Sequence, residues 1–252
     1  MNNNITLNRP FAETQLRNFH VNRGRGTFIR NRGYNREGNS CVRFSFSHIP
    51  PKFFKRPECS NFIAEDISEG LMPYWLARLL IPLNDKGTEA AHPALIARFA
   101  ASIDAFPSLS PASWRRVQLH LLSHILSLAE SHCIYATKTA LHSTLRASSA
   151  LELGLTTPLL PSPRIDSFDA CSFFIIAVKR ASEAFYSPAK SHETATATIK
   201  AIEAIESEVR YFEGPIVSTA AGEAEWDRVG NVILSAIEDE IATTKHNAAP
   251  AN

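Results

Sequence analysis

The sequence predicts an all-α fold: a helical bundle of six or seven helices, preceded by a largely disordered, basic N-terminal arm. Two observations predict the helices. From about residue 66 onward, apolar residues recur at helical spacing, and proline, serine and aspartate stand where helices begin and end. A third observation predicts the arm. Residues 1–57 are rich in Asn, Arg and Gly, show no sustained period, and hold too little apolar surface to offset the entropy of ordering.

The helices expected in the first half follow from their boundaries. Pro73 opens the segment YWLARLLI, and Pro82 stops it. Ser110 is suited to cap the next long helix, from Pro111 to about 131, because its hydroxyl can accept a hydrogen bond from a backbone N–H of the first turn. Two more helices are expected, over about 94–106 and 134–151.

The second half follows LTTPLLPSPR, a stretch of residues 155–164 that holds three prolines and acts as a linker. Asp166 or Ser167 caps a helix that runs to about Tyr186. Two further helices carry apolar stripes, over about 190–212 with Ile199, Ile202, Ile205, Val209 and Phe212, and over about 222–244 with Trp226, Val229, Ile233, Ile237 and Ile241. We expect the tryptophans to pack within the core or between helices, namely Trp75, Trp114 and Trp226.

Charge is divided unevenly along the chain. The whole chain has a formal net charge of +1, but residues 1–57 carry a net +9 and the remainder a net −8. Such asymmetry favours a basic tail with an acidic or phosphate-bearing partner. The expected domains are a flexible Arg/Gly/aromatic arm over 1–60, an α-helical domain over 61–246 with halves 66–153 and 165–244, and a disordered tail over 247–252.

The arm predicts a nucleic-acid interface. Arginine neutralises phosphates and releases counterions, glycine keeps the backbone mobile, and aromatic rings stack on unpaired bases. These properties suit single-stranded RNA better than a duplex groove. The aromatic residues of the arm include Phe19, Phe44 and Phe46, and the piece 41–49 alternates as a short strand would. The residues expected to bind are Arg17, Arg23, Arg25, Phe28, Arg30, Arg32, Tyr34, Arg36, Arg43, Lys52, Lys55 and Arg56.

Metal and catalytic sites are weakly indicated. His120 and His124 have the spacing that lets one helix present two imidazoles to a metal, but they share a polar stripe with Arg116, and no third ligand is fixed. A solvated helix face is therefore the preferred interpretation, and no metal or cofactor is expected. The sequence lacks GxSxG, GxxxxGK[ST] and a dinucleotide fingerprint, and its four cysteines form no CxxC. We expect a protein that is not an enzyme.

Membrane insertion and secretion are not expected. The longest apolar run, ACSFFIIAV at 170–178, is far shorter than the roughly twenty residues of a membrane-spanning helix. The first residues, MNNNITLNRP, lack the apolar core of a secretory signal. We expect a protein of the cytoplasm or of a virion.

Two functions compete for this pattern. The first is a non-enzymatic nucleic-acid-associated protein, such as a viral nucleocapsid or coat protein, in which a self-associating helical body carries the RNA-binding arm as a homo-oligomer. The second is a helical protein-interaction module, such as an adaptor or a toxin-immunity protein, in which the arm is incidental.

Overall fold

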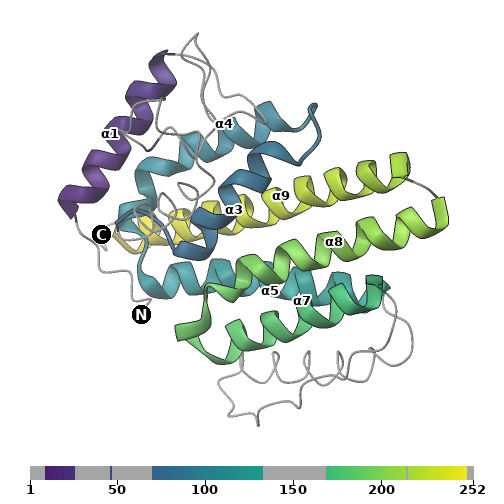
Figure 1. Cartoon of the computed structure of the whole chain (residues 1–252). Helices are drawn as coiled ribbons and strands as arrows, with labels where there is room; N and C mark the ends of the chain where they lie inside the picture. Colours follow the sequence, from purple (N-terminus) through teal and green to yellow (C-terminus); the bar gives the residue numbers. More distant parts are fainter. Residues whose placement is uncertain (1–8, 26–45, 47–69, 133–168, 214, 249–252) are drawn as a thin grey trace. The chain divides into compact units, whose positions relative to one another are not determined.

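The computed structural model describes residues 9–25, 46, 70–132, 169–213 and 215–248, and its regular elements are all helical (Figure 1). Over these residues the predicted all-α class is confirmed, and no strand is found. In chain order the elements are α1 (Arg9–Arg25), α3 (Tyr74–Asp85), α4 (His92–Ser102), the 3₁₀ helix η3 (Ile103–Ser108), α5 (Pro111–His132), α7 (Asp169–Tyr186), the 3₁₀ helix η4 (Pro188–Lys190), α8 (Glu193–Glu213) and α9 (Pro215–Ala248).

The described residues fall into two compact units. We call them the central unit, residues 118–232, and the terminal unit, residues 9–117 with 233–248. The dividing positions lie inside α5 and inside α9, so each of these helices contributes residues to both units. The expected helix over 134–151 and the proline-rich linker lie outside the described residues. The division into an arm and two helical halves therefore stays a prediction.

A line of aromatic rings forms the core of the terminal unit. Phe19 of α1 stacks on Phe46 with ring centroids 4.9 Å apart, and Phe46 meets Phe99 of α4 edge to face at 6.4 Å. Phe99 then contacts Phe106 of η3 at 5.7 Å, and Phe106 contacts Trp114 of α5 at 5.1 Å. Four of these rings are at most 2% exposed and Phe99 is 6% exposed. Edge-to-face pairs of this kind add to the stabilisation that burial of apolar area provides.

Two arginines attach the end of α9 within the terminal unit. Arg98 of α4 donates two hydrogen bonds to the carboxylate of Glu238, at 2.9 and 2.7 Å. Arg116 of α5 makes the same two-pronged contact with Glu240, at 2.5 and 2.6 Å. Bidentate arginine–carboxylate pairs are geometrically specific, which fixes the rotation of α9 as well as its position. The side chain of Arg116 is 51% exposed, as its place on the predicted solvated stripe requires, and the sequence does not indicate its pairing with Glu240.

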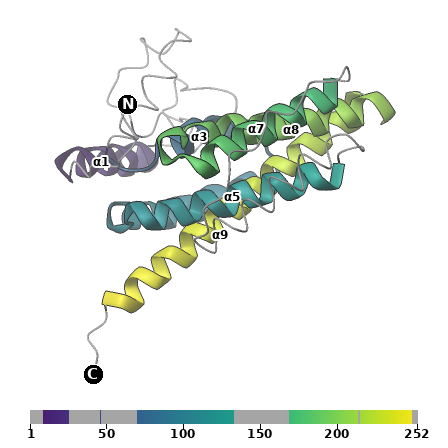
Figure 2. The same cartoon turned by 90° about the horizontal axis from the view of Figure 1, so that it is seen from below.

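The central unit is built on an antiparallel hairpin, α7 and α8, which lie side by side in both views (Figure 2). The described face that α8 buries consists mainly of alanine and threonine, which are small enough for its neighbours to approach closely. Gln118 of α5 is 2% exposed and donates to the Thr194 hydroxyl at 2.6 Å, near the start of α8. Ser218 of α9 donates to the backbone carbonyl of Glu206 at 2.6 Å. At Gly222, a Cβ atom would collide with the Glu206 side chain.

The helix boundaries agree with the sequence at most of the described ends. Ser110 caps α5 as expected, with its hydroxyl accepting from the backbone N–H of Ser113 at 3.1 Å. Pro82 does not stop α3, which continues to Asp85. Proline lacks the N–H that would donate to the carbonyl of Arg78, but its own carbonyl accepts from the N–H of Lys86 at 2.8 Å, which closes the last turn. The last helix begins at Pro215, earlier than the expected residue 222, because proline is well tolerated at a first helical position.

The buried side chains confirm the middle of each apolar stripe, while Ile199, Val209 and Ile241 toward the ends are half-buried. Trp226, Val229, Ile233 and Ile237 of α9 are all buried. Ile202 and Ile205 of α8 are buried as well. All three tryptophans are at most 2% exposed, so their expected packing role is confirmed.

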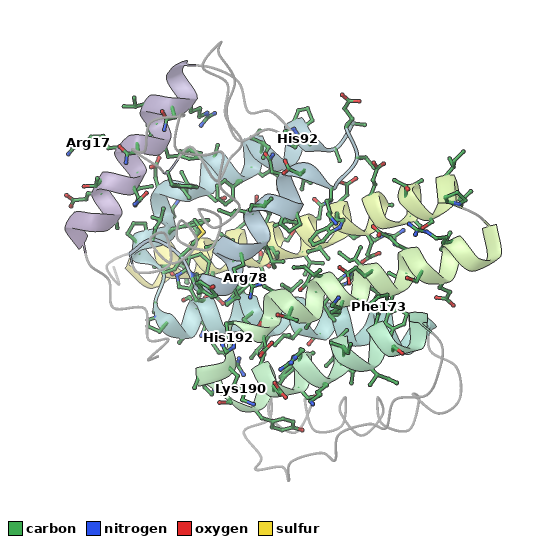
Figure 3. The ribbon with its side chains drawn as sticks, in the orientation of Figure 1. Arg17, Arg78, His92, Phe173, Lys190 and His192 are labelled. Atoms are coloured by element: carbon green, nitrogen blue, oxygen red, sulfur yellow. The ribbon has the colours of Figure 1, made fainter. Side chains whose placement is uncertain are left out.

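Substitution of Phe99 by alanine tests the aromatic core. We expect F99A to lower the free energy of unfolding by about 3–5 kcal/mol, because the cavity removes contacts with three neighbouring rings. Urea unfolding followed by circular dichroism measures this change. The matched control is Phe173→Ala in α7, a partly exposed ring covered by Lys200, which should cost clearly less (Figure 3). A loss below about 1 kcal/mol for F99A would contradict a core built on these rings.

Candidate nucleic-acid interface

The N-terminal basic segment contains a helix that the sequence did not predict. Residues 9–25 form α1, whereas we expected this part of the chain to belong to a largely disordered arm. Ala12 and Phe19 lie seven residues apart on one face of α1 and are buried. Two buried apolar positions are too few to make a periodic signal in the sequence. The helix is stabilised by tertiary packing, which local patterns do not report.

Ring contacts, a hydrogen bond and an ion pair hold α1 in the terminal unit. The Phe19 ring lies between Phe46 and Phe99, with its centroid 4.9 and 6.2 Å from theirs. Asn18 donates from Nδ2 to the backbone carbonyl of Phe46 at 3.3 Å. His20 Nε2 lies 2.7 Å from Asp104 Oδ1 of η3. These contacts bring Phe46 and α1 together, although they are far apart in the sequence.

The buried rings overturn one part of the nucleic-acid prediction. Phe19 and Phe46 were expected among the aromatic residues that stack on bases, but both are 0% exposed and stack on each other. A ring enclosed in the core has no face available to a nucleotide base. The expectation that these two rings bind nucleic acid is therefore wrong.

Two of the predicted phosphate-binding arginines are exposed on the described surface of α1. Arg17 projects outward from the helix (Figure 3), and Arg23 is exposed near its end. They are six residues apart, which is about 9 Å along the axis and about 120° around it. Because of this rotation, α1 offers two separate cationic points and not one continuous basic stripe.

The remaining predicted binding residues are not tested by the structure. Arg25 is the last residue of α1. The others lie outside the residues that the structure describes, and they are Phe28, Arg30, Arg32, Tyr34, Arg36, Arg43, Lys52, Lys55 and Arg56.

The described contacts of α1 make opposing contributions to the free energy that holds it in place. Burial of the Phe19 side chain contributes about 1.5–3 kcal/mol. Against this, Gln15 is 8% exposed, and its Oε1 atom has no hydrogen-bond partner in the part of the chain that the structure describes. A buried acceptor without a donor costs about 1–3 kcal/mol. The exposed pair of His20 and Asp104 adds little, since surface ion pairs contribute about 0–1 kcal/mol.

The solvated face predicted for the histidine pair of α5 is confirmed at His120 and only in part at His124. His120 is exposed, but His124 is partly buried and its Nε2 lies 2.8 Å from Glu225 Oε1 of α9. The Glu225 side chain is 1% exposed and also accepts from Arg228 at 2.6 Å. Groups of three or more side chains that could hold a metal ion are not found in the described part of the chain. His124 therefore acts in packing between α5 and α9 within the central unit.

Two opposing effects set the pKa of Glu225. Burial raises it, while the hydrogen bonds and charges of His124 and Arg228 lower it, and the net result is a pKa below the ordinary value. The carboxylate is therefore ionised in the fold despite its burial. No short motif marks this cluster, because His124 and Glu225 are 101 residues apart in the chain.

Acid should weaken the fold through Glu225. Its lowered pKa in the folded state stabilises the protein above the ordinary carboxyl pKa of 4.5, and this contribution is lost as pH falls through the folded value. We expect E225Q to lower the free energy of unfolding by about 1.5–3 kcal/mol at pH 7 and to flatten its dependence on pH between about 5 and 3. Urea unfolding at stepped pH measures both. Asp239→Asn, an exposed position of α9, is the control, and an equal effect there would contradict the assignment.

None of the helices that the structure describes combines the length and the apolar character needed to cross a bilayer.

Comparisons of the chain with protein-family models, with curated proteins and with solved structures find no match.

Proposed function

We propose that the protein is a non-enzymatic nucleic-acid-associated protein that binds the phosphates of single-stranded RNA through its basic N-terminal residues. The helical units serve packing or self-association. One observation carries the proposal: a net charge of +9 is concentrated in residues 1–57, while the rest of the chain is net −8. The exposure of Arg17 and Arg23 on α1 supports it, because both guanidinium groups can reach a phosphate without rearrangement of the core.

The physical basis of binding is electrostatic. Each arginine that neutralises a phosphate releases condensed counterions, which supplies affinity without sequence specificity. The acidic remainder of the chain repels the same phosphates and so confines RNA to the basic residues. A protein of this kind, assembled as a homo-oligomer along RNA, would act as a viral nucleocapsid or coat protein.

A second function has one specific observation in its favour. Ile216 is 85% exposed and Val217 is 43% exposed, side by side in the first turn of α9. Exposed apolar side chains next to one another are a feature of protein-binding surfaces. A helical interaction module, such as an adaptor or a toxin-immunity protein, would use such a position to contact a partner protein.

Salt dependence of RNA binding tests the first function. The affinity of the full chain for a single-stranded oligouridylate should fall steeply with salt, with a log–log slope that changes by about 0.7 for each phosphate contact. We expect the double variant R17Q/R23Q to weaken binding and to reduce the slope by about 1.4. Substitution of the arm residues Arg30, Arg32, Arg36 and Arg43 by glutamine should reduce it further. Fluorescence anisotropy between about 50 and 300 mM salt measures these slopes.

The control variant is K179Q/R210Q, which removes two exposed positive charges from α7 and α8. It changes the net charge as R17Q/R23Q does, and it should leave the slope unchanged. Equal slopes for the two double variants would show non-specific attraction to the whole protein and contradict the assigned interface. Electron microscopy of the protein with RNA distinguishes a nucleocapsid from an adaptor, because particles or filaments are expected of a nucleocapsid and not of an adaptor.

A further inference from the structure

Two of the four buried side chains that the structure describes in α1 are polar. Its described buried side chains are Ala12, Gln15, Asn18 and Phe19, so Phe19 is the one large apolar side chain among them. Asn18 has a partner in the Phe46 carbonyl, whereas Gln15 Oε1 has no hydrogen-bond partner among the described residues. Over the described part of the chain, the buried face of α1 thus combines one large apolar side chain with one unpaired polar atom.

We propose that α1 is a displaceable helix, in which Phe19 is the positioning residue that docks it and Gln15 keeps the docking weak. When α1 is docked, Arg17 and Arg23 are held at a fixed spacing and direction for a polyanion. When it is released, that arrangement is lost. The docking stands on the contacts of α1 alone, and its consequence for binding rests on the proposed function.

Docking and helix formation are coupled in α1. Its sequence, RPFAETQLRNFHVNRGR, contains Asn, Thr, Val and Gly, all of which have poor helix propensity, and it carries no acidic residue in its first turn. A helix of about seventeen residues with such a composition is marginal in water without tertiary contacts. Release of Phe19 from Phe46 and Phe99 therefore detaches the segment and also unfolds its helix. Arg17 and Arg23 then lose their fixed spacing.

Docking lowers the cost of binding by ordering the segment beforehand. A polyanion that contacts Arg17 and Arg23 on the formed helix does not have to fix their backbone. Released α1 offers the same charges but must be ordered on binding. A variant with looser docking should therefore keep the number of neutralised phosphates and lose affinity.

Hydrogen exchange of the full chain, without nucleic acid, tests the docking directly. We expect F19A to remove the protection of the amides of α1 while the buried parts of α5 and α9 keep theirs. Gln15→Leu replaces the unpaired acceptor by an apolar side chain, and it should slow exchange in α1 about tenfold. Phe174→Ala is the matched control, because Phe174 is an equally buried ring of α7 in the central unit. F174A should leave the exchange of α1 unchanged.

Each outcome decides the proposal. Unchanged protection of α1 in F19A would overturn the role of Phe19, and faster exchange in Q15L would overturn the role of Gln15. Q15L does not depend on a destabilised fold, so it remains informative if F19A fails to fold.

Binding of the oligouridylate then tests whether docking of α1 presents Arg17 and Arg23 to RNA. F19A should bind about tenfold more weakly with an unchanged salt slope, whereas a loss of arginine contacts would reduce the slope. Equal affinity of F19A and the unsubstituted chain would overturn the claim that docking presents the arginines. If the unsubstituted chain does not bind RNA, the proposed function fails, and the exchange data still decide whether α1 is displaceable.

Discussion

The contacts that run from Phe99 through Phe106 to Trp114 are the interaction on which the core of the terminal unit depends, and the stacked pair of Phe19 and Phe46 adds α1 to them. These rings join α1 and Phe46 to the consecutive elements α4, η3 and α5, from which both are far apart in the sequence. Hydrogen bonds and ion pairs in the same unit are directional, but they cannot replace the apolar area that these rings remove from water. The aromatic line therefore determines which elements belong together, and the polar contacts determine how they are oriented.

Local signals made much of the fold predictable. The Ser110 cap, the apolar stripe from Trp226 to Ile237 and the ends of α8 all depend on residues within one or two helical turns of each other. Helix α1 and the cluster around Glu225 were not predictable in this way. The burial of Phe19 depends on its ring contacts with Phe46 and Phe99, and the pairing of Glu225 depends on a histidine from another helix. Contacts between distant segments leave no period in the sequence.

The same distinction applies to the candidate interface. Net charge is a sum over residues and can be read without a structure, so the concentration of arginine in residues 1–57 was evident at once. Which of these side chains can contact RNA depends on their burial in the fold. Phe19 and Arg17 are two positions apart in α1, yet one is enclosed in the core and the other is exposed. An RNA interface built on this helix would use its charges and not its buried ring.

The buried carboxylate of Glu225 also has a consequence for the register of α9 against α5 in the central unit. A helix whose apolar side chains repeat every three or four residues could pack almost as well one turn out of place. A slip of one turn would move Glu225 about 5.4 Å along the axis, away from His124. It would then keep Arg228 of its own helix but lose the contact with His124, at a cost of about 1.5–3 kcal/mol. Apolar side chains make this pairing of helices strong, and the carboxylate of Glu225 selects one register among those that apolar packing alone would allow.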